Sequence, residues 1–193
     1  MKKIALVVLT IAFGSSISLA QVDKSFYQKP YESRNNDTFD QSTMLLSFGL
    51  GVPAFYTGSY NAAPTLYGKF EHGFLRDEVG LGGYISTGWG SYKYGSSKDK
   101  FTAFSVGFLG YYHFNKLIPI EKMDVYAGAG LAFRRFAYKT DDNTTIYDDY
   151  TDSDVLFVVK VGIRYYVVGN FAVYAESGWD DMSSVNFGGT FRF

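Results

Sequence analysis

The sequence predicts an all-β chain that closes into an eight-stranded antiparallel up-and-down transmembrane β-barrel. Three observations predict this fold: eight segments alternate apolar and polar residues, the connections between them alternate in length, and glycine is concentrated on the polar face. The composition agrees, because 19% of the 193 residues are aromatic and only 4 are proline. With 47% hydrophobic residues, the chain is too apolar to be disordered.

Charge and cysteine usage exclude several classes of protein. The chain has 18 basic and 19 acidic side chains, whereas a protein that follows nucleic-acid phosphates carries a marked basic excess. It has no cysteine, which excludes a disulfide scaffold, a thiolate metal site and a cysteine nucleophile. No nucleic-acid partner is expected.

The first twenty residues predict a secretory signal peptide. Lys2 and Lys3 precede an apolar run of about ten residues, which is shorter than the roughly 20 that a membrane-spanning helix needs. Small residues before Ala20 predict cleavage after it; the alternative is an uncleaved anchor helix. The expected organisation is therefore a signal peptide (1–20), a polar N-terminal periplasmic segment (21–41) and a barrel (42–193).

Eight segments carry the period-two alternation of β-strands. One face of each segment is apolar, as in Phe104, Val106 and Phe108, and the other is polar or small, as in Ser105 and Gly107. The expected strands are 42–52, 65–73, 78–87, 101–114, 123–136, 154–167, 171–178 and 184–193.

Three features predict that the apolar face points outward, toward lipid. Small residues inside leave room for larger ones in a narrow barrel, and nine strand glycines fall on the polar face against four on the apolar face. Connections of about twelve, thirteen and seventeen residues alternate with shorter ones, as in outer-membrane barrels. Strands of about nine to fourteen residues suit a tilted crossing of the hydrocarbon layer. The nine glycines are Gly49, Gly51, Gly80, Gly82, Gly107, Gly128, Gly130, Gly162 and Gly188.

The last strand, Val185-Asn186-Phe187-Gly188-Gly189-Thr190-Phe191-Arg192-Phe193, alternates and ends on phenylalanine. Together with the signal peptide, it resembles the small OmpA/OmpX-like outer-membrane β-barrel family of Gram-negative bacteria over about residues 42–193. The resemblance implies a bacterial outer-membrane location, with lipid and lipopolysaccharide around the barrel. It also implies that Phe191 and Phe193 belong to a C-terminal signal read by the barrel-assembly machinery. No peptidoglycan-binding domain follows the barrel, so cell-wall anchoring is not expected.

Seven charged residues fall on the predicted inner face. Buried charges are tolerated only when they are paired and hydrogen-bonded, and Lys160 and Glu176 are expected to form a cross-strand ion pair. The cluster is interpreted as a polar plug that holds the strands together. The alternative is a narrow passive channel, which five basic and two acidic residues would make anion-selective. The seven are Lys69, Glu71, Arg134, Lys160, Arg164, Glu176 and Arg192.

No catalytic residue, cofactor or metal site is predicted. His72 and His113 lie near the periplasmic strand ends without a serine nearby, and we interpret them as interface residues. Residues 140–154 hold six aspartates at a spacing unlike an EF-hand; a solvated loop is preferred, with divalent-cation binding as the alternative. Arg134 and Arg135, just below this loop, are placed to meet lipopolysaccharide phosphates. Residues 53–64 and 88–100 are expected to be solvated loops.

The sequence thus predicts a monomeric, non-enzymatic outer-membrane barrel with a structural or surface-interaction role. A narrow passive channel is the first alternative. A lipid-modifying enzyme is the second, although the sequence lacks a convincing catalytic cluster. A soluble lipocalin-like barrel is the third.

Overall fold

The computed structural model describes residues 38–54, 61–94, 97–118, 120–139 and 149–193. For residues 92–94 and 97–98 it describes the backbone alone. The predicted signal peptide and residues 21–37 of the polar segment lie outside the described residues, as do residues 55–60 and 140–148 of two predicted loops. Within the described part of the chain, no helix is long and apolar enough to cross a membrane.

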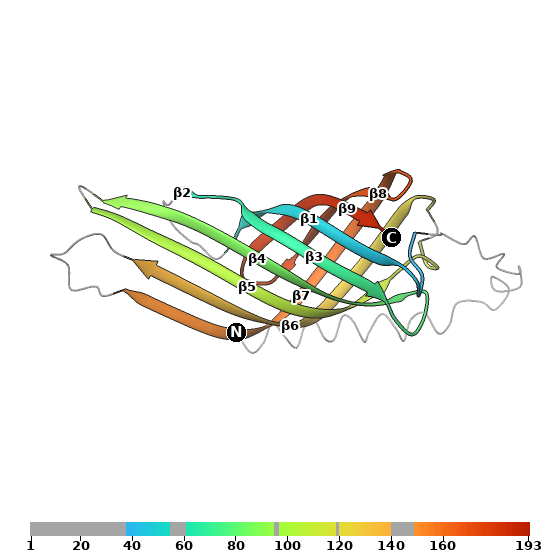
Figure 1. The fold of residues 1–193 in the computed structure, drawn as a ribbon, viewed down its shortest axis with the longest axis horizontal. Coiled ribbons are helices and arrows are strands. Elements are labelled where there is room, and N and C mark those ends of the chain that lie inside the picture. Colours follow the sequence, from blue (N-terminus) through green and yellow to red (C-terminus); the bar gives the residue numbers. More distant parts are fainter. Residues whose placement is uncertain (1–37, 55–60, 95–96, 119, 140–148) are drawn as a thin grey trace, which may run out of the picture. The chain divides into compact units, whose positions relative to one another are not determined.

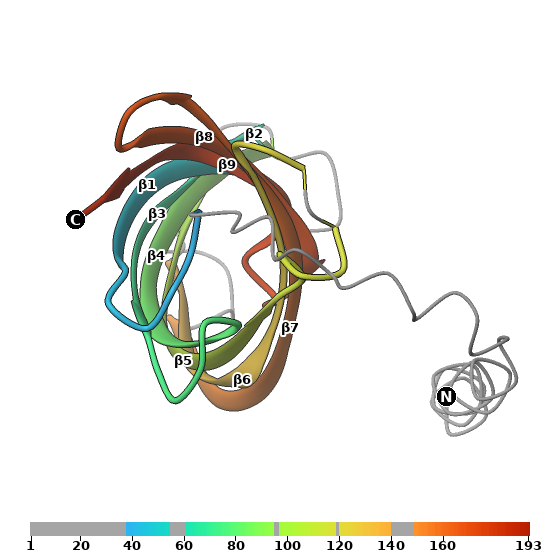
Figure 2. The ribbon, with the colours of Figure 1, turned by 90° about the vertical axis from the view of Figure 1, so that its right-hand side faces the viewer.

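Eight strands form one closed antiparallel barrel, which confirms the predicted fold class. β9 returns to pair with β1, and β4 pairs with both β3 and β5, so the ring runs β1-β3-β4-β5-β6-β7-β8-β9. The ring is seen end-on in Figure 2. A two-residue strand, β2 (Asn61–Ala62), adds to one edge of β4. The barrel strands are β1 (Met44–Pro53), β3 (Thr65–Gly73), β4 (Val79–Tyr94), β5 (Ser97–His113), β6 (Met123–Lys139), β7 (Tyr150–Val168), β8 (Phe171–Trp179) and β9 (Ser183–Arg192).

The two ends of the barrel differ. The chain enters and leaves at one end, where Met44 and Phe193 exchange backbone hydrogen bonds, and the connections at this end are residues 74–78, 114–122 and 169–170. We call it the short-turn end. At the other end β4, β5, β6 and β7, of 16 to 19 residues, extend beyond β1, β3, β8 and β9, of 9 or 10 (Figure 1). We call it the hairpin end.

The predicted limits of these four long strands were too short. Residues 88–100 form most of a β-hairpin, in which β4 reaches Tyr94 and β5 begins at Ser97, instead of the expected loop. Likewise, β7 begins at Tyr150, inside the stretch expected to be a solvated loop. The reason is that backbone pairing between neighbouring strands continues after the apolar alternation has stopped, since the ladder needs only N–H and C=O groups.

The outer surface of the barrel is apolar. Phe108 is 63% exposed and Phe48 57%, although burial is the usual state of such side chains. Exposed apolar surface this extensive marks contact with a membrane or a partner. We call this surface the apolar belt; it includes Phe48, Leu50, Phe70, Ile85, Phe104, Val106, Phe108, Leu131, Phe133, Val155, Phe157, Val159, Val161, Ile163, Val173, Phe187 and Phe191.

The inner glycines make room for tyrosine rings. Tyr84, Tyr111 and Tyr126 are each paired across strands with a glycine, namely Gly107, Gly128 and Gly162. A Cβ at any of these glycines would overlap the ring of its partner, whereas a Cβ at the outward-facing Gly110 would have no neighbour nearer than 3.9 Å. The glycines therefore allow large aromatic side chains to lie flat against the inner wall.

Candidate functional site: the charged barrel interior

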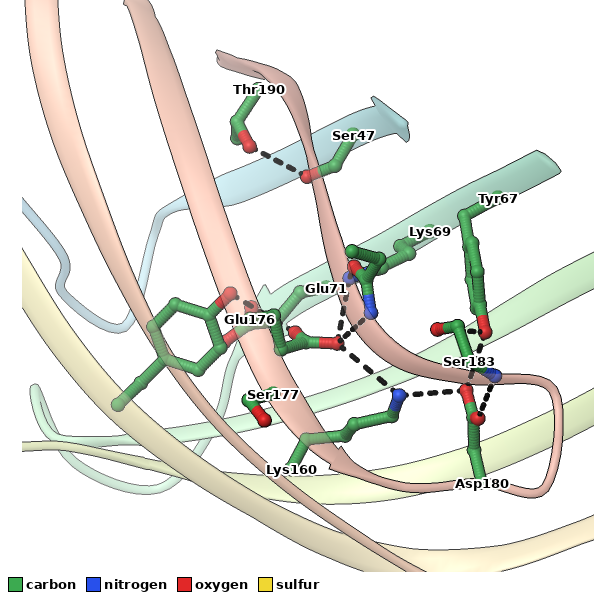
Figure 3. A network of polar contacts seen from close by, with 12 residues as sticks. Ser47, Tyr67, Lys69, Glu71, Lys160, Glu176, Ser177, Asp180, Ser183 and Thr190 are labelled. Atoms are coloured by element: carbon green, nitrogen blue, oxygen red, sulfur yellow. Dashed lines mark hydrogen bonds and ion pairs between the residues drawn. The ribbon is translucent and has the colours of Figure 1, made fainter. Parts of the chain in front are cut away.

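Charged side chains fill the middle of the barrel, in the region shown in Figure 3. The Lys160 ammonium on β7 lies 2.7 Å from Asp180 Oδ2, and both side chains are almost completely buried. The same oxygen accepts a hydrogen bond from the Tyr67 hydroxyl on β3, at 2.7 Å. Oδ1 of Asp180 accepts the backbone N–H groups of Met182 and Ser183, both at 2.9 Å. Asp180 thus has a partner for each of its oxygens.

These contacts hold the β8–β9 turn inside the barrel. Met182 is completely buried, and its carbonyl accepts hydrogen bonds from the Thr65 hydroxyl and the Ala54 N–H, both at 3.1 Å. The turn that joins β8 and β9 at the hairpin end therefore folds inward and fills the lumen there.

Glu176 on β8 holds a second group of contacts, next to the group around Asp180. Its Oε1 lies 2.8 Å from the Lys69 ammonium, and its Oε2 accepts a hydrogen bond from the Tyr126 hydroxyl at 3.0 Å. Lys69 also donates to Asn186 Oδ1 at 2.8 Å. The pair expected from the sequence, Lys160 with Glu176, has an N–O separation of 3.9 Å, so each of the two has a nearer partner.

A third group of charges lies nearer the short-turn end. His113 is completely buried between two carboxylates: Nε2 lies 2.6 Å from Glu71 Oε1, and Nδ1 lies 2.8 Å from Asp124 Oδ1. Arg164 donates to the remaining oxygen of each carboxylate, at 2.8 Å to Glu71 and 2.6 Å to Asp124. The four side chains form a closed ring of charge-assisted contacts. The prediction that His113 lies at the membrane interface was therefore wrong.

Tyr126 joins the second and third groups. Its hydroxyl donates to Glu176, and its ring lies 4.2 Å from the guanidinium carbon of Arg164. A cation over an aromatic face is an attractive arrangement that strengthens when water is excluded. The charged interior is consequently one network that reaches across β3, β5, β6, β7, β8 and β9.

Residues 38–43, which precede β1, cover this network at the short-turn end. The ring of Phe39 stacks on the His113 imidazole with centroids 3.5 Å apart, and the Tyr166 hydroxyl donates to the Thr38 carbonyl at 3.0 Å. Asp40 Oδ1 accepts hydrogen bonds from the Ser42 N–H and hydroxyl, both at 2.8 Å. The pKa of Asp40 lies below its ordinary value of 3.8, mainly because the Ser42 side chain donates a hydrogen bond to the ionised carboxylate.

The other site residues predicted from the sequence lie outside the three groups of charges described above. Arg134 faces inward at the hairpin end and pairs with Asp181, while Arg135 faces outward. Arg192 lies over the Tyr166 ring, 4.6 Å from its centroid. Phe191 and Phe193 are exposed on the outside at the short-turn end.

Sequence reasoning missed two buried carboxylates, Asp124 and Asp180. Asp124 alternates in phase with the inward-facing Tyr126, a signal that was present in the sequence; Asp180 lies in a turn, where alternation carries no information. With these two, Glu71 and Glu176 make four buried carboxylates, and Asp152 and Asp181 lie against Arg134 nearer the hairpin end. Six carboxylates therefore face the five predicted cations, which are Lys69, Arg134, Lys160, Arg164 and Arg192. The expected excess of five basic over two acidic residues was therefore wrong, and with it the argument for anion selectivity.

Ion pairs and hydrogen bonds engage the charged side chains of this interior. Both ring nitrogens of His113 are engaged by carboxylates, so neither is available to activate a nucleophile. In the described part of the chain, no three His, Cys, Asp or Glu side chains are arranged to hold a metal ion.

An apolar outer face around a charged, hydrogen-bonded interior defines the class of small transmembrane β-barrels. Solved structures share the fold. Ail, the attachment invasion locus protein of Yersinia pestis, solved in complex with the heparin analogue sucrose octasulfate, matches with a TM-score of 0.52 and 13% identity over 80% of this chain and 99% of its own. The outer membrane protein OprG from Pseudomonas aeruginosa matches with a TM-score of 0.50 and 11% identity over 80% of this chain and 97% of its own. No protein-family model and no curated protein sequence matches the chain.

Proposed function

We propose that this protein is a monomeric, non-enzymatic integral protein of the bacterial outer membrane, with a lumen closed to ions and a structural or surface-interaction role. The observation that carries the proposal is the buried charge network, which joins opposite walls of the barrel through Lys69–Glu176 and Arg164–Glu71. A barrel that holds charged side chains in its centre and apolar ones outside suits lipid as its surrounding solvent.

The network supports a closed lumen because opening it would separate buried ions. Breaking a buried pair by removal of one partner costs about 3–5 kcal/mol. A continuous water path would have to disrupt several such pairs and also displace the inward-folded β8–β9 turn. Closure of the lumen distinguishes this proposal from the narrow-channel alternative.

Export and assembly belong to the same proposal. A cleaved signal peptide at residues 1–20 would direct the chain across the inner membrane. The exposed, alternating last strand with Phe191 and Phe193 would then be the element that the barrel-assembly machinery receives. The short-turn end would face the periplasm, since outer-membrane barrels have short turns on that side.

The hairpin end supplies the surface for interaction. β4 to β7 continue beyond the apolar belt as a four-stranded sheet, which would stand above the outer leaflet. Outward-facing residues there are polar, as at Thr102, Arg135 and Ser153. Lipopolysaccharide would surround the base of this sheet.

Because the chain contains no cysteine, single cysteines test its location and orientation. Asp149→Cys places a thiol at the hairpin end, and Asn170→Cys places one at the short-turn end; both positions are exposed. On intact cells, a membrane-impermeant maleimide is expected to label the first and spare the second until the outer membrane is permeabilised. Equal labelling of both, or recovery of the protein in the soluble periplasmic fraction, would contradict the proposal.

A further inference from the structure

We propose that His113 carries a positive charge, with a proton on each ring nitrogen, and that this proton locks residues 38–43 onto the short-turn end of the barrel. We call residues 38–43 the entry segment. The inference goes beyond the proposed function, because it assigns a latch operated by one proton to one end of the barrel.

Two short hydrogen bonds determine the protonation of the imidazole. Nε2 lies 2.6 Å from Glu71 Oε1, and Nδ1 lies 2.8 Å from Asp124 Oδ1. An ionised carboxylate only accepts hydrogen bonds, whereas a neutral imidazole has one donor nitrogen and one acceptor nitrogen. A neutral ring would therefore turn a lone pair toward one of the two carboxylate oxygens. Only the imidazolium donates a hydrogen bond to both.

The charges around the ring lead to the same assignment. The side chains that form ion pairs around it are Glu71 from β3, Asp124 from β6 and Arg164 from β7. The guanidinium of arginine stays protonated in proteins, so the three carry one net negative charge, which the imidazolium neutralises. His113 and Asp124 are completely buried, and an unpaired charge at such depth is costly.

Other titratable groups at this end leave that balance unchanged. The phenols packed near the ring are uncharged at neutral pH. Asp40 in the entry segment is exposed and accepts hydrogen bonds from Ser42, and Arg192 on β9 lies over the Tyr166 ring. The phenols are Tyr111 on β5, Tyr126 on β6 and Tyr166 on β7.

Phe39 connects the imidazole to the entry segment. Its ring stacks on the imidazole with centroids 3.5 Å apart and an angle of 11° between the planes. A cation over an aromatic face is attracted to it, and the attraction strengthens where water is excluded. The proton on His113 therefore strengthens the contact through which the entry segment meets the charged interior.

The rest of the entry segment is attached by neutral hydrogen bonds. The Tyr166 hydroxyl donates to the Thr38 carbonyl at 3.0 Å, and the Gly73 N–H donates to the Thr43 carbonyl at 2.9 Å. Loss of the His113 proton would leave a net negative charge under Phe39, and water would have to enter to solvate it. Because Phe39 occupies the place that this water needs, the entry segment is the part that yields.

The latch is consequently closed while His113 is protonated and released as the pH rises. Histidine is the side chain that most readily changes charge near neutral pH. The same reasoning applies to Phe39→Ala, in which water competes with the carboxylates for the ring, so that the imidazole can release its proton.

Nuclear magnetic resonance of the refolded protein in detergent micelles reads the protonation of the ring. With ¹⁵N-labelled histidine only two rings give signals, and His72→Gln leaves those of His113. At about pH 7.5, where an ordinary histidine is mostly neutral, both ring nitrogens of His113 are expected to be protonated. An unprotonated ring nitrogen at this pH would overturn the assignment.

A nitroxide on Gln41→Cys reports the release of the entry segment, because Gln41 is exposed and the chain contains no cysteine. The mobility of the label is measured by electron paramagnetic resonance from about pH 6 to about pH 10, a range that starts below the ordinary titration of histidine. We expect the label to loosen in one step, at the pH at which the ¹⁵N signals show loss of the His113 proton. A label that stays immobile over the whole range, or loosens at a different pH, would contradict the latch.

Glu71→Gln removes the need for the proton and keeps the shape of the side chain. The amide nitrogen can donate to Nε2 of His113 while the amide oxygen accepts from Arg164, so a neutral imidazole has all its partners. His113 is then expected to be neutral at about pH 7.5, and the pH step in the mobility of the label is expected to be lost. A step that survives this substitution would overturn the inference.

Glu78→Gln is the matched control, because it makes the same change at the same end of the barrel, where the carboxylate lies 3.3 Å from the Lys116 ammonium. It should keep the pH step. Asp124→Asn repeats the test at the other ring nitrogen, in case Glu71→Gln does not fold, and heat-modifiable migration identifies the folded variants. A folded Asp124→Asn barrel in which His113 is neutral and the step is lost supports the latch, and one in which the step remains contradicts it.

Discussion

Lys160 Nζ on β7 lies 2.7 Å from Asp180 Oδ2 in the β8–β9 turn, inside a barrel whose outer face is apolar. Asp180 also accepts two backbone N–H groups of its own turn and the Tyr67 hydroxyl. One carboxylate therefore holds a turn in place, neutralises a buried ammonium and connects β3 to β7. Its contacts make the inward fold of the turn a defined feature of the structure.

Removal of the Asp180 carboxylate is expected to destabilise the barrel strongly. Asp180→Ala leaves the Lys160 ammonium buried without its nearest partner, which costs about 3–5 kcal/mol. Urea unfolding of the refolded protein in detergent measures the loss. Asp77→Ala, in an exposed short turn, is the control and should change stability by less than about 0.5 kcal/mol. The double variant Lys160→Met/Asp180→Ala should recover part of the loss; no recovery would show that the ion pair is not its source.

Glycine at 162 is expected to be required for the position of the Tyr126 ring. A Cβ there would overlap the ring and displace its hydroxyl from Glu176. Gly162→Ala should cost about 1–3 kcal/mol, the usual range for overpacking. Gly110→Ala adds the same methyl group on the outer face, where the nearest atom is 3.9 Å away, and should be neutral or slightly stabilising. Equal effects of the two substitutions would contradict the packing argument.

Phe39 is expected to protect His113 from solvent. In the wild-type protein the stacked ring covers the imidazole, so diethyl pyrocarbonate should modify His72 and leave His113 intact. In Phe39→Ala, mass spectrometry should find both histidines modified, and stability should fall by about 3 kcal/mol. Since the chain has only these two histidines, His72 serves as the internal reference. Rapid modification of His113 in the wild type would contradict the closed short-turn end.

The turn at Asp40 is expected to weaken in acid. Because the pKa of Asp40 in the folded chain lies below its ordinary value of 3.8, its contribution to stability is fully present above about pH 4 and is lost as the pH falls through the lower folded value. Ser42→Ala removes the largest cause of the shift, so an NMR titration of the Asp40 carboxyl should show a higher pKa than in the wild type. An unchanged pKa would assign the shift to other groups.

The alternating pattern was sufficient to predict the barrel, its strand number and the inward direction of residues such as Lys160 and Glu176. It was insufficient where structure does not depend on alternation. The extension of β5 to Ser97 follows from backbone pairing alone, and Asp180 acts from a turn. The inward direction of His113 could have been predicted, because His113 lies two residues after the inward-facing Tyr111 on the same strand. Its place at the end of the strand led instead to the prediction that it lies at the membrane interface. Partner choice, such as Lys69 with Glu176, depends on distances across the barrel that strand-by-strand patterns do not contain.

Conductance in planar bilayers tests most directly whether the buried charge network closes the lumen. The purified, refolded protein is expected to insert without channel openings at any applied voltage, and Lys160→Ala/Glu176→Ala, which removes charges from the centre of the network, is the variant in which openings should first become visible. Heat-modifiable migration of both proteins confirms that folded barrels were inserted. Stable, reproducible single-channel steps from the wild-type protein would contradict the closed lumen and favour the narrow channel.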